Sequence, residues 1–155
     1  MNIIAVDDEK LALEGVMTAI NKAKPDAKVQ GFRHGMDAVK HVENNSCDVA
    51  FLDIEMREIN GIELAKKIRE LNPGAVFIFI TGHEEFAFEA AQIHLSGFLA
   101  KPVNQYDLQD TLRRSIKQVN GHRLTNMNHN IAKFNNGKIL WNRRLPWRGQ
   151  CTADS

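Results

Sequence analysis

Acidic residues stand at two points in the sequence where an apolar run ends. Asp7 and Asp8 follow the run 2–6, and Asp53 ends a run that begins at Val49. The second run is too short for a helix and does not alternate with polar residues, which predicts a strand buried on both faces of a parallel sheet. Ligands bind at the carboxyl ends of such strands. A single Asp there could equally cap the next turn, so the prediction of a ligand site depends on the residues at the other strand ends.

Two further apolar runs end in polar residues of another kind. Thr81 follows 75–80, and Lys101 follows 97–100. Carboxylates gathered at one sheet edge would repel one another without a cation, and hard oxygen ligands suit Mg²⁺. A lysine charge and a threonine hydroxyl suit phosphoryl oxygens, and a carboxylate can itself become an aspartyl phosphate. Taken alone, each could be an ordinary surface residue; four strand ends on one edge favour a site.

The elements that must position these residues alternate between short apolar runs and amphipathic stretches. This alternation predicts an α/β fold of five βα units, a five-stranded parallel sheet with helices on both faces. The expected strands are 2–6, 28–33, 49–52, 75–80 and 97–100. The expected helices cover 13–20, 38–42, 61–71, 84–95 and 104–119. Asn104 is the expected cap of the last helix.

Five short motifs occur in order along the chain: Asp7-Asp8, Leu52-Asp53-Ile54-Glu55-Met56, Asn60-Gly61, Ile80-Thr81-Gly82 and Phe98-Leu99-Ala100-Lys101-Pro102. In this order and spacing they resemble the receiver domain of two-component response regulators, over about residues 1–120. The stretch 84–102 is most similar to LytR/AlgR-type receivers. The fold implied is flavodoxin-like and doubly wound, with strand order 2-1-3-4-5.

The resemblance implies a phosphoacceptor and a metal site. Asp53 would accept phosphoryl from a phosphohistidine of a sensor histidine kinase. Asp8, Asp53 and the backbone carbonyl of Glu55 would hold Mg²⁺, with Asp7 acting through water. The family often has Pro where this chain has Arg57, so the loop after the third strand differs in mobility or charge.

The resemblance also implies a switch. Thr81 and Lys101 would contact the phosphoryl oxygens, and Phe98 would occupy the aromatic switch position, although it also suits a core. The bond between Lys101 and Pro102 is expected to be cis. The protein would then be a signalling switch that assists its own phosphorylation and dephosphorylation, not an enzyme. Regulation of transcription is the expected output, through an output or homodimer surface in residues 84–120.

Two other classes of protein compete with this interpretation. A flavodoxin-like FMN carrier needs a phosphate loop rich in Gly, Ser and Thr after the first strand, where Asp7-Asp8-Glu9 stands. A phosphatase that forms an aspartyl phosphate on a small metabolite is the closer alternative. It would carry a second catalytic Asp two places after Asp53, where this chain has Glu55.

The charge distribution divides the 155-residue chain near Gly121. Residues 1–120 hold 14 Lys+Arg and 18 Asp+Glu, whereas residues 121–155 hold 6 and 1. We expect a receiver domain at 1–120 and a basic tail or a fragment of an output domain at 121–155. DNA would be bound only through such an output domain. The runs 131–134 and 138–141 around Asn136-Gly137 suggest a hairpin. Residues 145–155 show no pattern, and 142–155 could be truncated or appended sequence.

The remaining composition is that of an ordinary cytosolic domain. The apolar runs are strand-sized, and the chain begins with a strand pattern instead of a signal segment, so we expect a cytoplasmic protein without a membrane span. The two cysteines, Cys47 and Cys151, do not suggest a disulfide framework, and Cys47 is expected to fill the core. The six His residues show no ligand-like spacing.

Overall fold

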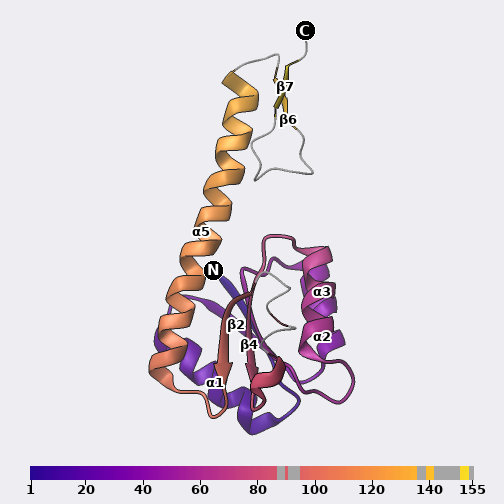
Figure 1. The fold of residues 1–155 in the computed structure, drawn as a ribbon, viewed down its shortest axis with the longest axis vertical. Coiled ribbons are helices and arrows are strands. Elements are labelled where there is room, and N and C mark those ends of the chain that lie inside the picture. Colours follow the sequence, from indigo (N-terminus) through magenta and orange to yellow (C-terminus); the bar gives the residue numbers. More distant parts are fainter. Residues whose placement is uncertain (87–89, 91–94, 136–138, 142–150, 154–155) are drawn as a thin grey trace. The chain divides into compact units, whose positions relative to one another are not determined.

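A five-stranded parallel sheet forms the centre of the first part of the chain (Figure 1). The computed structural model describes residues 1–86, 90, 95–135, 139–141 and 151–153. The strands follow the order β2-β1-β3-β4-β5, which confirms the predicted doubly wound order. Among the described residues, no helix is both long and apolar enough to cross a membrane.

The elements alternate along the chain as the sequence predicts. The strands are β1 Asn2–Val6, β2 Lys28–Phe32, β3 Val49–Asp53, β4 Val76–Thr81 and β5 Leu95–Ala100. The helices are α1 Lys10–Ala23, α2 Gly35–Asn44, α3 Gly61–Leu71 and α5 Gln105–Asn135, with a short 3-10 helix η1 at Glu84–Phe86. The single turn η1 follows β4 directly.

The parallel register aligns the carboxyl ends of the strands. Val6 pairs with Leu52, Asp53 pairs with Ile80, and Thr81 pairs with Ala100. Residues that follow these strands therefore leave the sheet at the same edge. This edge is where open α/β sheets place their ligands.

Apolar side chains alternate between the two faces of the sheet and bury both. On one face Leu52 and Phe79 join a buried cluster with side chains of α2 and α3, such as Ile68. On the other face lie α1 and the beginning of α5 (Figure 1), and Gln105 Nε2 donates to the Ala19 carbonyl across them at 3.0 Å. Coverage of both faces explains why β3 and β4 are apolar along their length, without alternation.

Asparagine side chains begin two of the helices. Asn60 Oδ1 accepts a hydrogen bond from the Glu63 backbone N–H at 2.8 Å and so caps α3. Asn104 Oδ1 accepts from the N–H groups of Tyr106 and Asp107 at 2.7 and 3.3 Å, which confirms the predicted cap of α5. Each cap satisfies backbone donors that have no partner within the first turn.

The predicted helix 84–95 is wrong at its carboxyl end. Leu95 belongs to β5 and pairs with Phe77, whereas Gly97 pairs with the next residue, Ile78. This irregularity inserts an extra residue into β5, so the strand starts earlier than its apolar pattern suggests. Residues 87–89 and 91–94 of the predicted helix lie outside the described residues.

The predictions for the carboxyl-terminal part are wrong in two respects. Helix α5 was expected to stop near Gly121 but continues to Asn135, because this glycine has no positive φ and helix interiors tolerate glycine. Residues 131–134 are therefore helical, and the hairpin predicted with 138–141 does not form. Instead, β6 at Ile139–Trp141 pairs antiparallel with β7 at Cys151–Ala153.

The chain divides into two compact units, Met1–Ile116 and Lys117–Ser155. The division falls near the change in charge at Gly121. Helix α5 begins in the first unit and ends in the second. The candidate site described next lies within the first unit.

Gly61, the first residue of α3, is required by a close approach of the backbone. A Cβ atom at this position would overlap the carbonyl oxygen of Asp53 and contact its carbonyl carbon at 2.9 Å. The Gly61 N–H also donates to the Ile54 carbonyl at 2.9 Å. The glycine therefore lets α3 begin directly against the end of β3.

We predict that Gly61→Ala destabilises the protein by about 1–3 kcal/mol, because backbone atoms would have to move. Gly15→Ala is the matched control, since Gly15 lies inside α1 with open space around its Cβ position. The control should stabilise the protein by roughly 0.5–1 kcal/mol through helix propensity. Urea unfolding measures both changes. Equal effects of the two substitutions would show that the contact with Asp53 is unimportant.

Candidate functional site

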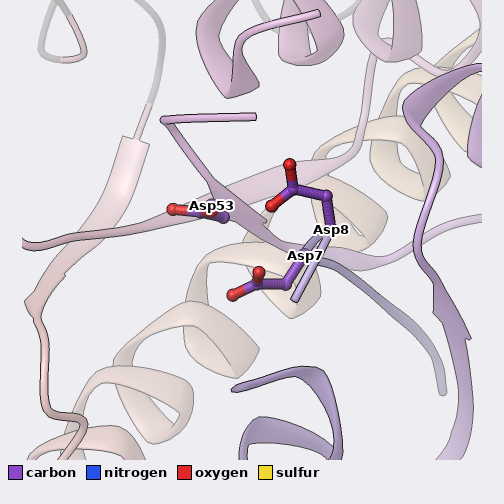
Figure 2. Close-up of side chains that lie close together, drawn as sticks. All are labelled: Asp7, Asp8 and Asp53. Atoms are coloured by element: carbon purple, nitrogen blue, oxygen red, sulfur yellow. The ribbon is translucent and has the colours of Figure 1, made fainter. Parts of the chain in front are cut away.

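Three carboxylates converge where β1 and β3 end. Asp7 and Asp8 directly follow β1, and Asp53 is the last residue of β3. Their oxygen atoms lie within 4.8 Å of one another, side by side in Figure 2. Asp7 and Asp53 are only 3% and 4% exposed, whereas Asp8 lies nearer the surface. The sequence therefore predicted correctly that these carboxylates lie together.

Lys101 places a positive charge beside the two buried carboxylates. Its Nζ lies 3.1 Å from Asp7 Oδ2 and 3.4 Å from Asp53 Oδ1. The backbone positions it, because the Lys101 N–H donates to the Thr81 carbonyl at 2.9 Å and so continues the pairing of β4 with β5. The peptide bond between Lys101 and Pro102 is cis.

Backbone and side-chain donors hold Asp7 and Asp8 in place. Asp7 Oδ1 accepts the Glu9 N–H at 2.9 Å, and Asp8 Oδ2 accepts the Arg57 N–H at 3.2 Å. Arg33 donates from Nε and Nη2 to the backbone carbonyl of Asp8, at 3.3 and 3.1 Å. Sequence reasoning did not select Arg33. The only signal was its place after β2, the neighbour of β1.

Burial and neighbouring charge change the ionisation of the site. Burial first, and then repulsion from Asp7, raise the pKa of Asp53 to about 6, against an opposing effect of Lys101. Burial alone would lower the pKa of Lys101, but the charge of Asp53 and the hydrogen bond to Asp7 carry it above its ordinary value. The lysine is therefore charged, and the carboxylates retain an excess of negative charge.

Thr81 ends β4 with its side chain 1% exposed. Its Oγ1 accepts the backbone N–H of His83 at 3.1 Å. The His83 ring lies 3.3 Å from Glu55 Oε2 and 3.2 Å from Glu85 Oε1. It thus lies between the loop after β3 and the segment after β4. Sequence reasoning gave His83 no role, because its spacing from other histidines resembles no metal motif.

Comparison with known proteins identifies the family that shares this arrangement. The sequence model of the response regulator receiver domain matches residues 3–113. The chain belongs to the response regulator receiver family. This confirms the resemblance found in the sequence motifs.

Curated relatives of this receiver domain include regulators with longer chains. The positive alginate biosynthesis regulatory protein of Pseudomonas aeruginosa is 33% identical over 123 residues, which are 76% of this chain and 48% of the relative. The transcriptional regulatory protein LytR of Staphylococcus aureus is 23% identical over 146 residues, 94% of this chain and 58% of the relative. The chain thus spans about half the length of the curated relatives it matches.

Solved structures show the same fold. The response regulatory domain of MrkE from Klebsiella pneumoniae has a TM-score of 0.71 at 28% identity, covering 78% of this chain and 99% of that one. A CheY-like receiver domain from Methanospirillum hungatei also has a TM-score of 0.71, at 23% identity, covering 78% and 97%. The second likeness concerns the fold alone.

The receiver's acidic residues fit a hard divalent cation. The three carboxylates offer oxygen atoms within 4.8 Å of one another, and Asp8 remains partly open to solvent. Burial, and then the neighbouring charge of Asp7, raise the pKa of Asp53, so a cation at this site would favour its ionised form. Oxygen donors with free coordination positions suit Mg²⁺, which retains several waters. Glu55, whose backbone carbonyl is the expected further ligand, follows β3 by two residues.

Phe98 lies in the middle of β5, opposite Phe79 of β4. Its side chain is partly buried and packs against the core cluster. Thr81 pairs with Ala100 in the same two strands, so Thr81 and Phe98 belong to adjacent strands near the site. The side chain therefore serves at least as core filling.

Asp53 should make the metal-free receiver less stable as the pH rises. The folded state, with a pKa of about 6, binds this proton more tightly than the unfolded state, whose pKa is near 3.8. Stability is therefore lost as the pH increases from about 4 to above 6. We predict that Asp53→Asn is more stable than the wild type by about 1–3 kcal/mol at about pH 7, and equal near pH 4.

Denaturant unfolding in the presence of a chelator, repeated across this pH range, measures the difference. The exposed Asp37 of α2 provides the control, and Asp37→Asn should follow the wild-type pH dependence. A pH-independent difference between Asp53→Asn and the wild type would contradict the raised pKa.

Proposed function

We propose that this receiver domain accepts a phosphoryl group on Asp53 from the phosphohistidine of a sensor histidine kinase, in a Mg²⁺-dependent reaction. The observation that carries this proposal is that the buried carboxylate of Asp53 lies close to two other carboxylates and 3.4 Å from the ammonium group of Lys101. A buried carboxylate at a strand end, with a cation and further oxygen ligands beside it, is arranged to act as a nucleophile.

In the proposed transfer, an Asp53 carboxylate oxygen forms a bond to phosphorus while the bond from phosphorus to the histidine nitrogen breaks, and the histidine keeps the electron pair. At about pH 7 a carboxyl with a pKa of about 6 is mostly ionised, so the nucleophile is available. Lys101 lies close enough to stabilise charge on the phosphoryl oxygens. Burial of Asp53 limits access of water.

A bound Mg²⁺ would neutralise the charge of the phosphoryl oxygens and of the carboxylates around them. Asp8, Asp53 and the backbone carbonyl of Glu55 are the proposed ligands, and Asp7 would act through a water molecule. Asp7 is already paired with Lys101 at 3.1 Å, which supports its indirect role. Asp8 is the more accessible of the two adjacent carboxylates.

We further infer that Thr81 and Phe98 form the switch. The Thr81 hydroxyl oxygen accepts the His83 N–H. After phosphorylation of Asp53, the Thr81 hydroxyl would leave this partner and donate to a phosphoryl oxygen. Its movement would open space for Phe98 on the adjacent strand to turn inward. Such coupling between a site and a surface is typically worth about 1–3 kcal/mol. The proposed output surface includes residues 84–120 and would form a two-fold homodimer.

The same site favours a signalling switch over a metabolite phosphatase. Such a phosphatase needs a general acid two residues after the nucleophile, and here the Glu55 carboxylate faces His83 at 3.3 Å. We therefore propose that the protein is not an enzyme acting on a small substrate. It assists only the phosphorylation and dephosphorylation of its own Asp53.

The proposed output is regulation of transcription in the cytoplasm. One curated relative is named a transcriptional regulatory protein and another a biosynthesis regulatory protein, and this chain spans about half of each. DNA contact would then depend on an output domain. Residues 121–155 would be either a fragment of that domain or a basic tail.

We predict that acetyl phosphate with Mg²⁺ adds one phosphoryl group to the wild type, detected by intact mass. Asp53→Asn should abolish this gain, because the amide is not a nucleophile. Asp37→Asn, which changes an exposed carboxylate of α2, should leave it intact. Undiminished phosphoryl incorporation in Asp53→Asn would refute the assignment.

Phe98→Ala should uncouple the site from the dimer surface. We expect this variant to bind Mg²⁺ and beryllofluoride, an aspartyl-phosphate mimic, while losing the activated dimer in sedimentation experiments. Phe32→Ala is the control, since Phe32 is also partly buried against the core but belongs to β2, at the other edge of the sheet. An activated dimer of unchanged strength in Phe98→Ala would show that Phe98 is core filling alone.

A further inference from the structure

The backbone of Asp8 is held by a side chain from outside the phosphoryl site. Arg33 directly follows β2, and its Nε and Nη2 donate to the same carbonyl oxygen, that of Asp8, at 3.3 and 3.1 Å. A guanidinium presents its donors in a rigid planar fork, so two hydrogen bonds to one oxygen restrain its position more than one bond would. We propose that Arg33 is a positioning residue for metal binding by Asp8. This inference rests on the proposed function of the acidic site.

The base of Arg33 is itself fixed to the sheet. The residue before it, Phe32, accepts the Asp7 N–H at 3.1 Å in the pairing of β1 with β2. The residue two places after it, Gly35, is buried so closely against Ile59 that a Cβ there would overlap its side chain. The Arg33 guanidinium therefore extends from an anchored backbone to the loop that carries Asp8.

The two ends of Asp8 are held by different loops. Its carbonyl oxygen is held by Arg33, and its carboxylate oxygen Oδ2 accepts the backbone N–H of Arg57 at 3.2 Å. Both contacts orient the residue before any ligand is present. Asp7 needs no such support from Arg33, because it is buried and paired with Lys101. The more exposed carboxylate is thus the one that depends on external contacts.

An effect of the Arg33 charge and a role of Arg33 in positioning Asp8 predict opposite changes in Mg²⁺ affinity when Arg33 is removed. If only charge mattered, loss of a nearby positive charge would strengthen the binding of a cation. If Arg33 positions Asp8, its loss should weaken binding. Substitution of outer residues that orient a metal ligand typically weakens affinity about 10- to 100-fold. Because Arg33 is exposed and acts through the backbone, we expect an effect at or just below the lower end of that range, a roughly threefold to tenfold weaker affinity for Mg²⁺.

The experiment is calorimetric titration of the full chain with Mg²⁺, comparing the wild type with Arg33→Ala, Arg33→Lys and Arg57→Ala. Arg57→Ala is the charge control, because it removes an exposed positive side chain beside Asp8 but keeps the backbone N–H that donates to it. We expect weaker binding in Arg33→Ala, partial recovery in Arg33→Lys through a single retained donor, and binding at least as tight as the wild type in Arg57→Ala. Thermal unfolding without metal checks that each variant is folded.

Equal or tighter binding of Mg²⁺ by Arg33→Ala would overturn the positioning role while leaving the phosphoacceptor function in place. Equal weakening in Arg33→Ala and Arg57→Ala would also overturn it, since loss of charge or disturbance of the loops would then suffice. Failure of the wild type to bind Mg²⁺ would instead refute the proposed function, and this inference with it. If Arg33→Ala does not fold, the comparison of Arg33→Lys with Arg57→Ala decides in the same way.

Discussion

The central constraint on this molecule is the concentration of negative charge at the end of β1 and β3. Burying carboxylates within 4.8 Å of one another is unfavourable unless a cation compensates them, and Lys101 does so only in part. Burial first, and then repulsion from Asp7, raise the pKa of Asp53 against the opposing effect of Lys101. The surrounding structure must therefore hold the carboxylates together against their mutual repulsion. The same cluster of carboxylate oxygens is suited to hold a divalent cation.

The parallel sheet provides that restraint. Three separate registers bring the last residues of β1, β3, β4 and β5 to one edge, and β1, β3 and β4 are buried along nearly all of their length. Gly61 lets α3 start against the carbonyl of Asp53, because a Cβ at this position would overlap that carbonyl oxygen. Rigid support of this kind keeps a functional site preorganised although the site itself is strained by its charge.

The five βα units and the acidic site could be predicted from apolar periodicity and from polar residues at strand ends, whereas the strand order followed from the resemblance to receiver domains. Other features could not. The start of β5 at Leu95 depends on an irregular pairing with Phe77, which no local pattern encodes. The continuation of α5 past Gly121 depends on a backbone conformation that glycine permits but does not require. The role of Arg33 depends on the spatial adjacency of β1 and β2, not on spacing along the chain.

The hydrogen bond from the His83 N–H to Thr81 Oγ1 has a consequence for the proposed switch. A buried hydroxyl that changes partners must leave its old donor satisfied by another acceptor or by water, otherwise the full cost of an unpaired N–H opposes the change. His83 is about half exposed and its ring lies beside Glu55 and Glu85. Water can therefore reach this segment and replace Thr81 as the acceptor. The resting and activated arrangements can then be close in free energy, which is the condition under which one phosphoryl group is able to shift the balance between them.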